Sequence, residues 1–134
     1  MATSQLKGAI DLVLGRPFEW LGRGPDAFDC LGLWLHLLHV ELQVWIAHPF
    51  RAHADGGSET ELLAFWRRFE EIPLDDAELP LDLFFWRPGG RPHVATVQDS
   101  WWTASVDHQS GVHRLPWLIA RGKAEKAYRL LGDW

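Results

Sequence analysis

The chain has 134 residues, of which 47% are hydrophobic, and it carries a formal net charge of −5. This length predicts one domain, which we assign to residues 1–134, with enough apolar content for a core without disulfide bonds. The single cysteine excludes a disulfide framework and a multi-cysteine metal site, and the acidic balance argues against a general nucleic-acid binder. The longest apolar run, 31–38, is too short to span a bilayer, so we expect no membrane insertion. No basic-then-apolar signal peptide opens the chain, which predicts synthesis in the cytoplasm.

The first half of the chain predicts helices. Apolar residues recur at helical spacing over 4–14, with Ser4 as the expected cap and an end at Gly15. Glycine and proline turn signals over 15–29 then predict a structured loop. A second helix should begin at Cys30, capped by Asp29, and end before Pro49. Because it is apolar on nearly every face, we expect it to be the central helix of the fold.

A polar loop is predicted over 47–57, and a third helix after it. Ser58 and Glu61 form a capping box, and the helix that they open should run to about Glu71.

After residue 79 the pattern changes to short β-prone runs, at 81–86, 94–97, 101–106 and 112–115. They predict an antiparallel meander of about four strands. The segment 124–131 should add a helical turn or an edge strand. Helices followed by strands indicate an α+β fold, with the central helix packed on an antiparallel sheet of about four to six strands.

Cys30 is the strongest candidate for chemistry. It lies in the first turn of the expected central helix, where unpaired backbone N–H groups and the helix dipole favour negative charge. That position predicts a lowered thiol pKa and hence a nucleophilic sulfur. The same N–H groups would stabilise an oxyanion beside it. The alternative is a buried cysteine that serves only as a small hydrophobic residue.

A nucleophilic cysteine needs a base within hydrogen-bond reach, and seven histidines compete for that role. His36 and His39 have the spacing of metal ligands on a helix, but no third ligand is evident, so we expect no metal and interpret both as packing residues. His48 and His53 flank the polar loop and are expected at the surface. His113 falls on the last predicted strand.

His93 and His108 are better placed to act as the base. His93 opens a strand directly after a Pro-Gly-Gly turn, and a strand is a rigid platform for an imidazole aimed at a helix N-terminus. His108 lies in the next turn, where the neighbouring Asp107 could orient an imidazole.

Nine tryptophans are unusual for this length. Adjacent residues on a strand face opposite ways, so one of Trp101 and Trp102 should be exposed. It would pack against another protein or, as the weaker alternative, stack on a sugar. Four others sit at apolar-patterned positions and are expected in the core: Trp34, Trp45, Trp66 and Trp86.

Several segments together resemble the NlpC-type cell-wall cysteine peptidases. Gly-Arg-Pro-Phe-Glu-Trp at 15–20 resembles the Pro-Tyr-x-Trp-Gly-Gly stretch of that family. Phe-Asp-Cys-Leu-Gly-Leu at 28–33 resembles its Asp-Cys-Leu-Gly-Leu box, a version frequent in the phage and prophage tail branch. Three later segments also match. Leu-Asp-Leu at 81–83 resembles the Gly-Asp-Leu strand of the family, and His-Val-Ala-Thr-Val at 93–97 resembles its His-Val-Gly strand. Gly-Val at 111–112 resembles its later Gly-Val turn. Order and spacing agree over roughly 5–118.

The resemblance implies a papain-like fold in which Cys30 is the nucleophile and His93 the general base. The substrate would be an amide bond of the murein stem peptide, and no cofactor is implied. The third catalytic position, usually a histidine, falls on Ser105, with His108 three residues later as the alternative. Four further residues would contribute to substrate binding: Phe18, Trp20, Asp29 and Trp102.

Three functions remain open at this point. The leading one is a phage-tail-associated peptidoglycan endopeptidase, carried in the virion with tail-tip proteins as partners. Phe18, Leu81 and Ser105 replace the tyrosine, glycine and histidine of the family, and these departures favour a degenerate domain that serves as a structural tail component. The third reading is a cytosolic thiol hydrolase or transferase acting on another amide.

Overall fold

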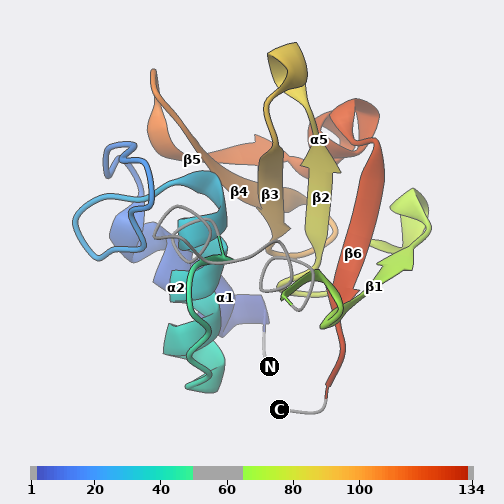
Figure 1. Cartoon of the computed structure of the whole chain (residues 1–134), viewed down its shortest axis with the longest axis horizontal. Coiled ribbons are helices and arrows are strands. Elements are labelled where there is room, and N and C mark those ends of the chain that lie inside the picture. The colour runs from blue at the N-terminus through green and yellow to red at the C-terminus, as the bar shows by residue number, and fades with distance from the viewer. Residues whose placement is uncertain (1–2, 50–64, 133–134) are drawn as a thin grey trace.

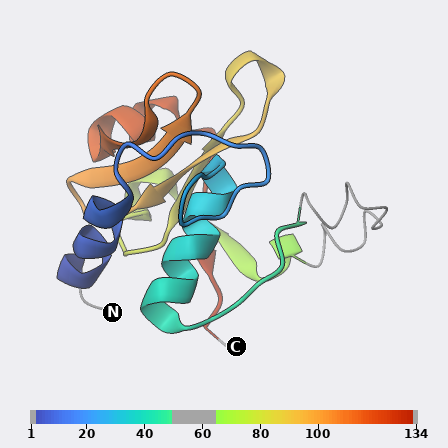
Figure 2. The same ribbon diagram turned by 90° about the vertical axis from the view of Figure 1, so that its left-hand side faces the viewer.

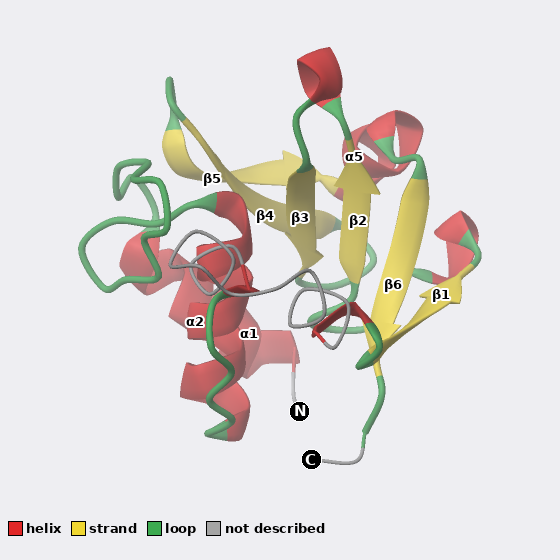
Figure 3. Cartoon of the chain, viewed as in Figure 1, coloured by secondary structure: helices red, strands yellow, loops and turns green. Residues whose placement is uncertain are grey.

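The chain folds as helices packed on an antiparallel sheet (Figures 1 and 3). The computed structural model describes residues 3–49 and 65–132, and in this part α1 spans Thr3–Val13, α2 spans Cys30–Leu42 and α5 spans Trp117–Lys123. The sheet has six strands in the order β1-β6-β2-β3-β4-β5. Their bounds are Phe69–Ile72, Leu83–Trp86, His93–Val97, Trp102–Asp107, Gly111–Pro116 and Lys126–Leu130, for β1 to β6 in turn.

The two N-terminal helices pack side by side against one face of the sheet (Figure 2). In α1 the residues Leu6, Ile10 and Val13 are buried, while Lys7 and Asp11 form an exposed ion pair one turn apart. In α2 every residue from Leu31 to Leu35 is buried, so this helix is enclosed by the rest of the fold. The sequence prediction of a central helix is confirmed.

The sheet is buried on both faces because successive strand residues point in opposite directions. Leu83 and Val94 belong to the core under α1 and α2, whereas Phe84 and Ala95 belong to a second core under α5. A short 3₁₀ turn, Leu74–Asp76, lies at the edge of that second core. In this arrangement β3 and β4 both pack against α2.

The predicted boundaries need several corrections. The first helix begins at Thr3, so Ser4 lies inside it, and the second ends at Leu42, where Gln43 adopts a left-handed conformation. The capping box at 58–61, His53 and most of the polar loop lie outside the described residues. Helix does not continue to Glu71, because Phe69–Ile72 pairs with β6 as a strand and this pairing overrides the local helical pattern.

The C-terminal segment also differs from expectation. Trp117–Lys123 forms α5, which the sequence analysis did not predict. The strand β6 lies between β1 and β2 rather than at an edge. A bidentate contact from Arg129 to the buried Asp82, at 2.8 and 3.0 Å, ties β6 to the residue just before β2.

The tryptophans divide differently from the prediction. Trp34 is fully buried, but Trp45 is 64% exposed, and Trp66 and Trp86 are half-buried. Both members of the adjacent pair are exposed, since Trp101 precedes β4 in a bend and only Trp102 belongs to the strand. Among the described residues, no helix is both long and apolar enough to cross a bilayer.

Candidate active site

The first turn of α2 is shaped by Asp29. Its Oδ1 accepts a hydrogen bond from the Gly32 N–H at 2.5 Å, which caps the helix, and its Oδ2 accepts from the Leu21 N–H at 2.9 Å, which fastens the preceding loop. The loop passes so close to the helix that a Cβ on Gly32 would overlap the carbonyl oxygen of Gly22. Glycine at position 32 is therefore required, and the arrangement presents Cys30 as the first residue of the helix.

The sulfur of Cys30 lies against the backbone of β3. Hydrogen bonds from the backbones of Val94, Leu31 and Cys30 itself reach the sulfur and lower its pKa. Val94 is the residue that follows His93, so the sulfur lies against the start of the strand that carries this histidine.

The prediction of a lowered thiol pKa is contradicted. Although Cys30 is partly exposed as a residue, burial raises the pKa of its thiol to about 11, and the charge of Asp29 contributes to the rise. The helix position and its N–H groups do not outweigh this desolvation. At neutral pH the sulfur is therefore held as a neutral thiol.

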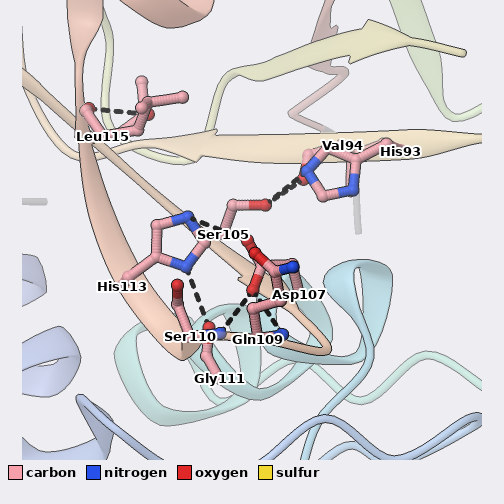
Figure 4. Close-up of polar contacts among 10 residues, drawn as sticks. His93, Val94, Ser105, Asp107, Gln109, Ser110, Gly111, His113 and Leu115 are labelled. Atoms are coloured by element: carbon pink, nitrogen blue, oxygen red, sulfur yellow. Dashed lines mark hydrogen bonds and ion pairs between the residues drawn. The ribbon is translucent and has the colours of Figure 1, made fainter. Parts of the chain in front are cut away.

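His93 is joined to Ser105 across the neighbouring strand (Figure 4). Its Nε2 lies 2.7 Å from Ser105 Oγ, and the Ser105 hydroxyl donates its hydrogen to the carbonyl oxygen of Val94 at 3.0 Å. A hydroxyl has one hydrogen, so Oγ must accept from the Nε2–H of His93. The imidazole is thereby fixed in the tautomer whose Nδ1 carries a free lone pair, which is the atom that a general base uses.

The surroundings of His93 keep its imidazole neutral. The Trp86 ring packs edge-on against it, with centroids 4.6 Å apart. Burial lowers the pKa of His93 to about 4; Asp107 opposes this shift, and His113 and Lys123 add to it. At neutral pH the thiol of Cys30 and the imidazole of His93 are therefore both uncharged.

His108, the alternative third residue, lies elsewhere. Its ring packs at a tilt against the ring of Phe18, with centroids 3.9 Å apart. Asp107 does not orient His108, because its Oδ1 accepts from the backbones of Gln109 and Ser110, and its Oδ2 faces His113 Nε2 at 3.8 Å (Figure 4). The geometry therefore brings Ser105, and not His108, to His93.

His48 was expected at the surface, but it is 3% exposed. Its Nε2 lies 2.9 and 3.1 Å from the two carboxylate oxygens of Asp29. The chain after α2 folds back to bring this side chain to the start of the helix. Ile46, two residues earlier, is also buried, so the stretch after α2 alternates between buried and exposed residues.

The remaining candidates lie in the loop before α2 and at the start of β4. Trp20 is 60% exposed in the loop before α2, and Trp102 is 42% exposed at the start of β4. Trp45 carries the Arg23 guanidinium over its ring at 3.6 Å. Across the described residues, no group of three His, Cys, Asp or Glu side chains is arranged to hold a metal ion.

This arrangement can carry out attack coupled to proton transfer. Transfer of the thiol proton to Nδ1 would create a thiolate and an imidazolium, and the attraction between them would offset part of the cost of burying each charge. The backbone N–H groups at the start of α2 can stabilise an oxyanion formed next to the sulfur. Sequence reasoning missed His48 and Trp86, because each acts through tertiary contacts that no local motif marks.

Solved structures share this fold. The NlpC/p60 domain of the peptidoglycan hydrolase SagA superposes with a TM-score of 0.67 at 18% identity, covering 97% of this chain and 100% of that chain. NlpC2 from Trichomonas vaginalis gives 0.61 at 16% identity, covering 96% of this chain and 46% of that one. An NLP/P60-family protein from Staphylococcus aureus, described as similar to a lipoprotein, gives 0.62 at 17% identity, covering 98% and 42%.

A scan against protein-family models found no match, and a search of curated proteins found none either. At these identities the structural likeness establishes the fold, which is the papain-like α+β fold of NlpC/p60 domains.

Proposed function

We propose that this protein is a cysteine endopeptidase that cleaves amide bonds in the stem peptides of peptidoglycan. The proposal is supported by the contact between His93 and Ser105, which leaves Nδ1 free as a base beside the segment that holds Cys30. The shared fold with a peptidoglycan hydrolase domain directs the choice of substrate.

The reaction needs only groups of this chain and water. The sulfur of Cys30 bonds to the carbonyl carbon while its proton passes to His93 Nδ1, and the resulting oxyanion is stabilised by N–H groups at the start of α2. The C–N bond then breaks as the imidazolium protonates the leaving amine. Water, deprotonated by His93, then attacks the thioester carbonyl. The C–S bond breaks to release the new carboxylate, and the imidazolium returns its proton to the sulfur of Cys30.

Each side chain beside the dyad has a defined part in this scheme. Ser105 holds the tautomer of His93 and accepts from Nε2–H when the ring becomes charged. Trp86 shields the imidazole and fixes its plane. Phe18, Trp20 and Trp102 are proposed to contact the substrate, and Asp29 acts on Cys30 from the cap of α2.

We further propose that the enzyme works in a phage tail, where it opens the cell wall locally beside tail-tip proteins. The Cys-Leu-Gly-Leu form of the box around Cys30 supports this setting. Purification of virions from a producing strain, followed by immunodetection of this chain, tests it. Presence in the tail fraction would support the setting, and presence in the host cytosol alone would oppose it.

A structural tail component without turnover is the second candidate. The observation in its favour is the thiol pKa of Cys30, which burial raises to about 11 and which disfavours a preformed thiolate. The two candidates differ in whether bonds are broken.

Digestion of purified peptidoglycan separates them. The wild-type chain should release new amino termini. In Cys30→Ala and His93→Ala the rate of this release should be lower by at least about two orders of magnitude. The NlpC/p60 domain of SagA serves as the positive control. No release by the wild type, under conditions where that domain releases amines, would favour the structural role.

A further inference from the structure

A buried contact between a histidine and a carboxylate adjoins the nucleophile, and the histidine takes part in none of the reaction steps. His48 and Asp29 have side chains that are 1% and 2% exposed, and Nε2 lies within hydrogen-bond distance of both carboxylate oxygens. Burying such a pair is costly unless its geometry is satisfied, so its presence needs a reason.

Asp29 has three functions at this point. It caps α2 through the Gly32 N–H, it holds the preceding loop through the Leu21 N–H, and its charge acts on the thiol of Cys30. Capping alone does not require a charge, because serine or asparagine caps helices equally well. Because the carboxylate of Asp29 lies one residue from the nucleophile, its position has to be fixed and its negative charge has to be offset by a neighbouring donor.

The groups that face this carboxylate can be identified. His48 donates from Nε2, and the Arg23 guanidinium interacts with its charge through space. Arg23 is anchored elsewhere, because its Nη1 donates to the Ile46 carbonyl at 2.7 Å. The thiol itself is faced by Asp29 and, from β3, by the backbone of Val94 beside His93. The imidazole of His48 contacts both oxygens of Asp29.

We propose that His48 is a positioning residue that acts on Cys30 through Asp29. By holding both carboxylate oxygens it fixes the first turn of α2 and withdraws negative charge from the sulfur, so that the thiol can ionise when His93 takes its proton. This inference rests on the proposed function only in treating Cys30 as the nucleophile.

The experiment measures thiol reactivity directly and needs no peptidoglycan. Cys30 is the single cysteine, so iodoacetamide modification of the folded chain reports on that sulfur alone. Below the thiol pKa the rate follows the thiolate fraction, which changes tenfold per pKa unit. The variants are His48→Ala, which removes the donor, and His48→Gln, which retains an N–H donor, each checked for folding by circular dichroism.

We expect His48→Ala to slow alkylation between pH 8 and 10 by about three- to tenfold, equivalent to up to one pKa unit. His48→Gln should stay within about twofold of the wild type. With peptidoglycan as substrate, His48→Ala should lower kcat and leave KM nearly unchanged. A folded His48→Ala variant with the wild-type alkylation profile would overturn the proposal, whatever the activity on peptidoglycan.

A second variant keeps the test decisive if His48→Ala does not fold. Asp29→Asn keeps one amide oxygen, which can still accept from the Gly32 N–H of the cap, but it loses the second acceptor, used by the Leu21 N–H, and the negative charge. Without that charge, alkylation should become faster than in the wild type. Adding His48→Gln to Asp29→Asn should then change the rate no further. An unchanged rate in Asp29→Asn would show that the pair does not act on the thiol and would refute the inference.

Discussion

Removal of the Ser105 hydroxyl should reduce turnover without unfolding the protein. In Ser105→Ala, His93 Nε2–H loses its acceptor at 2.7 Å, and the imidazole is free to rotate or to change tautomer. The hydrogen bond matters most when the ring is charged, during transfer of the thiol proton. A hydrogen bond to a charged group contributes about 1.5–3 kcal/mol, which corresponds to about 10- to 150-fold in kcat.

Thr103 provides a matched control for this variant. It lies on the same strand, it is buried like Ser105, and its hydroxyl donates to the Leu115 carbonyl at 2.9 Å, away from His93. Thr103→Val and Ser105→Ala each remove one buried hydroxyl that bonds a neighbouring backbone. Each should cost about 1 kcal/mol of unfolding free energy in urea, so a difference in kcat isolates the effect on the imidazole.

The assay is amine release from peptidoglycan at saturating substrate, at pH 7, with both variants and the wild type. Thr103→Val should stay within about twofold of the wild-type kcat. The nitrogen-15 spectrum of the wild type should show His93 protonated at Nε2, and Ser105→Ala should show a mixture of tautomers. Equal kcat values for the two variants, or a wild-type ring protonated at Nδ1, would refute the reasoning.

Three further predictions concern stability and electrostatics. Because the pKa of His93 falls from its ordinary 6.5 to about 4, the unfolded chain takes up a proton first as the pH drops. Between pH 7 and pH 4 the unfolding free energy of the wild type should therefore fall by about 3 kcal/mol more than that of His93→Gln, as measured by urea titration. An equal fall in the two proteins would contradict this. Trp86→Ala should raise the His93 pKa toward 6.5 in a proton NMR titration, because water reaches the ring; a value still near 4 would exclude shielding by Trp86. Gly32→Ala should lower the unfolding free energy by about 1–3 kcal/mol, because the added Cβ clashes with the Gly22 carbonyl. The control is Gly8→Ala at an exposed position of α1, where a Cβ meets nothing within 4 Å, and it should raise the unfolding free energy by about 0.5–1 kcal/mol.

The fold could be predicted from the sequence where local pattern and burial agree. The central helix with its Asp29 cap, and strands β2 to β5, follow from apolar periodicity and turn residues, and the structure confirms them. The third helix was extended wrongly into Phe69–Ile72, because the pairing of this segment with β6 depends on a chain segment about 60 residues away. Non-local pairing of this kind leaves little signal in a short window of sequence.

Leu81 illustrates what a family pattern can and cannot tell. It stands where the resembling family has glycine, and its φ of 73° is the left-handed conformation that glycine adopts without strain. The leucine keeps this backbone conformation because its side chain is buried and its carbonyl accepts from Trp34 Nε1 at 2.9 Å. The substitution therefore leaves the local path of the chain intact.

The site was foreseen in part. Cys30, His93 and Ser105 follow from spacing, and the structure joins His93 to Ser105 by a hydrogen bond. The thiol pKa was predicted in the wrong direction, since helix position can be read from sequence but desolvation by surrounding elements cannot. His48 was assigned to the surface because a histidine beside a polar loop gives no sign of a carboxylate partner 19 residues earlier.

Detection of a covalent intermediate tests most directly whether Cys30 attacks an amide of peptidoglycan. The wild-type chain is mixed with a soluble stem-peptide fragment, quenched in acid within milliseconds to seconds, and analysed by intact-protein and peptide mass spectrometry. We predict an adduct with the mass of the acyl portion of the fragment, attached at Cys30, that forms and decays with turnover and is absent in Cys30→Ala. Product formation by the wild type with no adduct, or an adduct on another residue, would contradict the account.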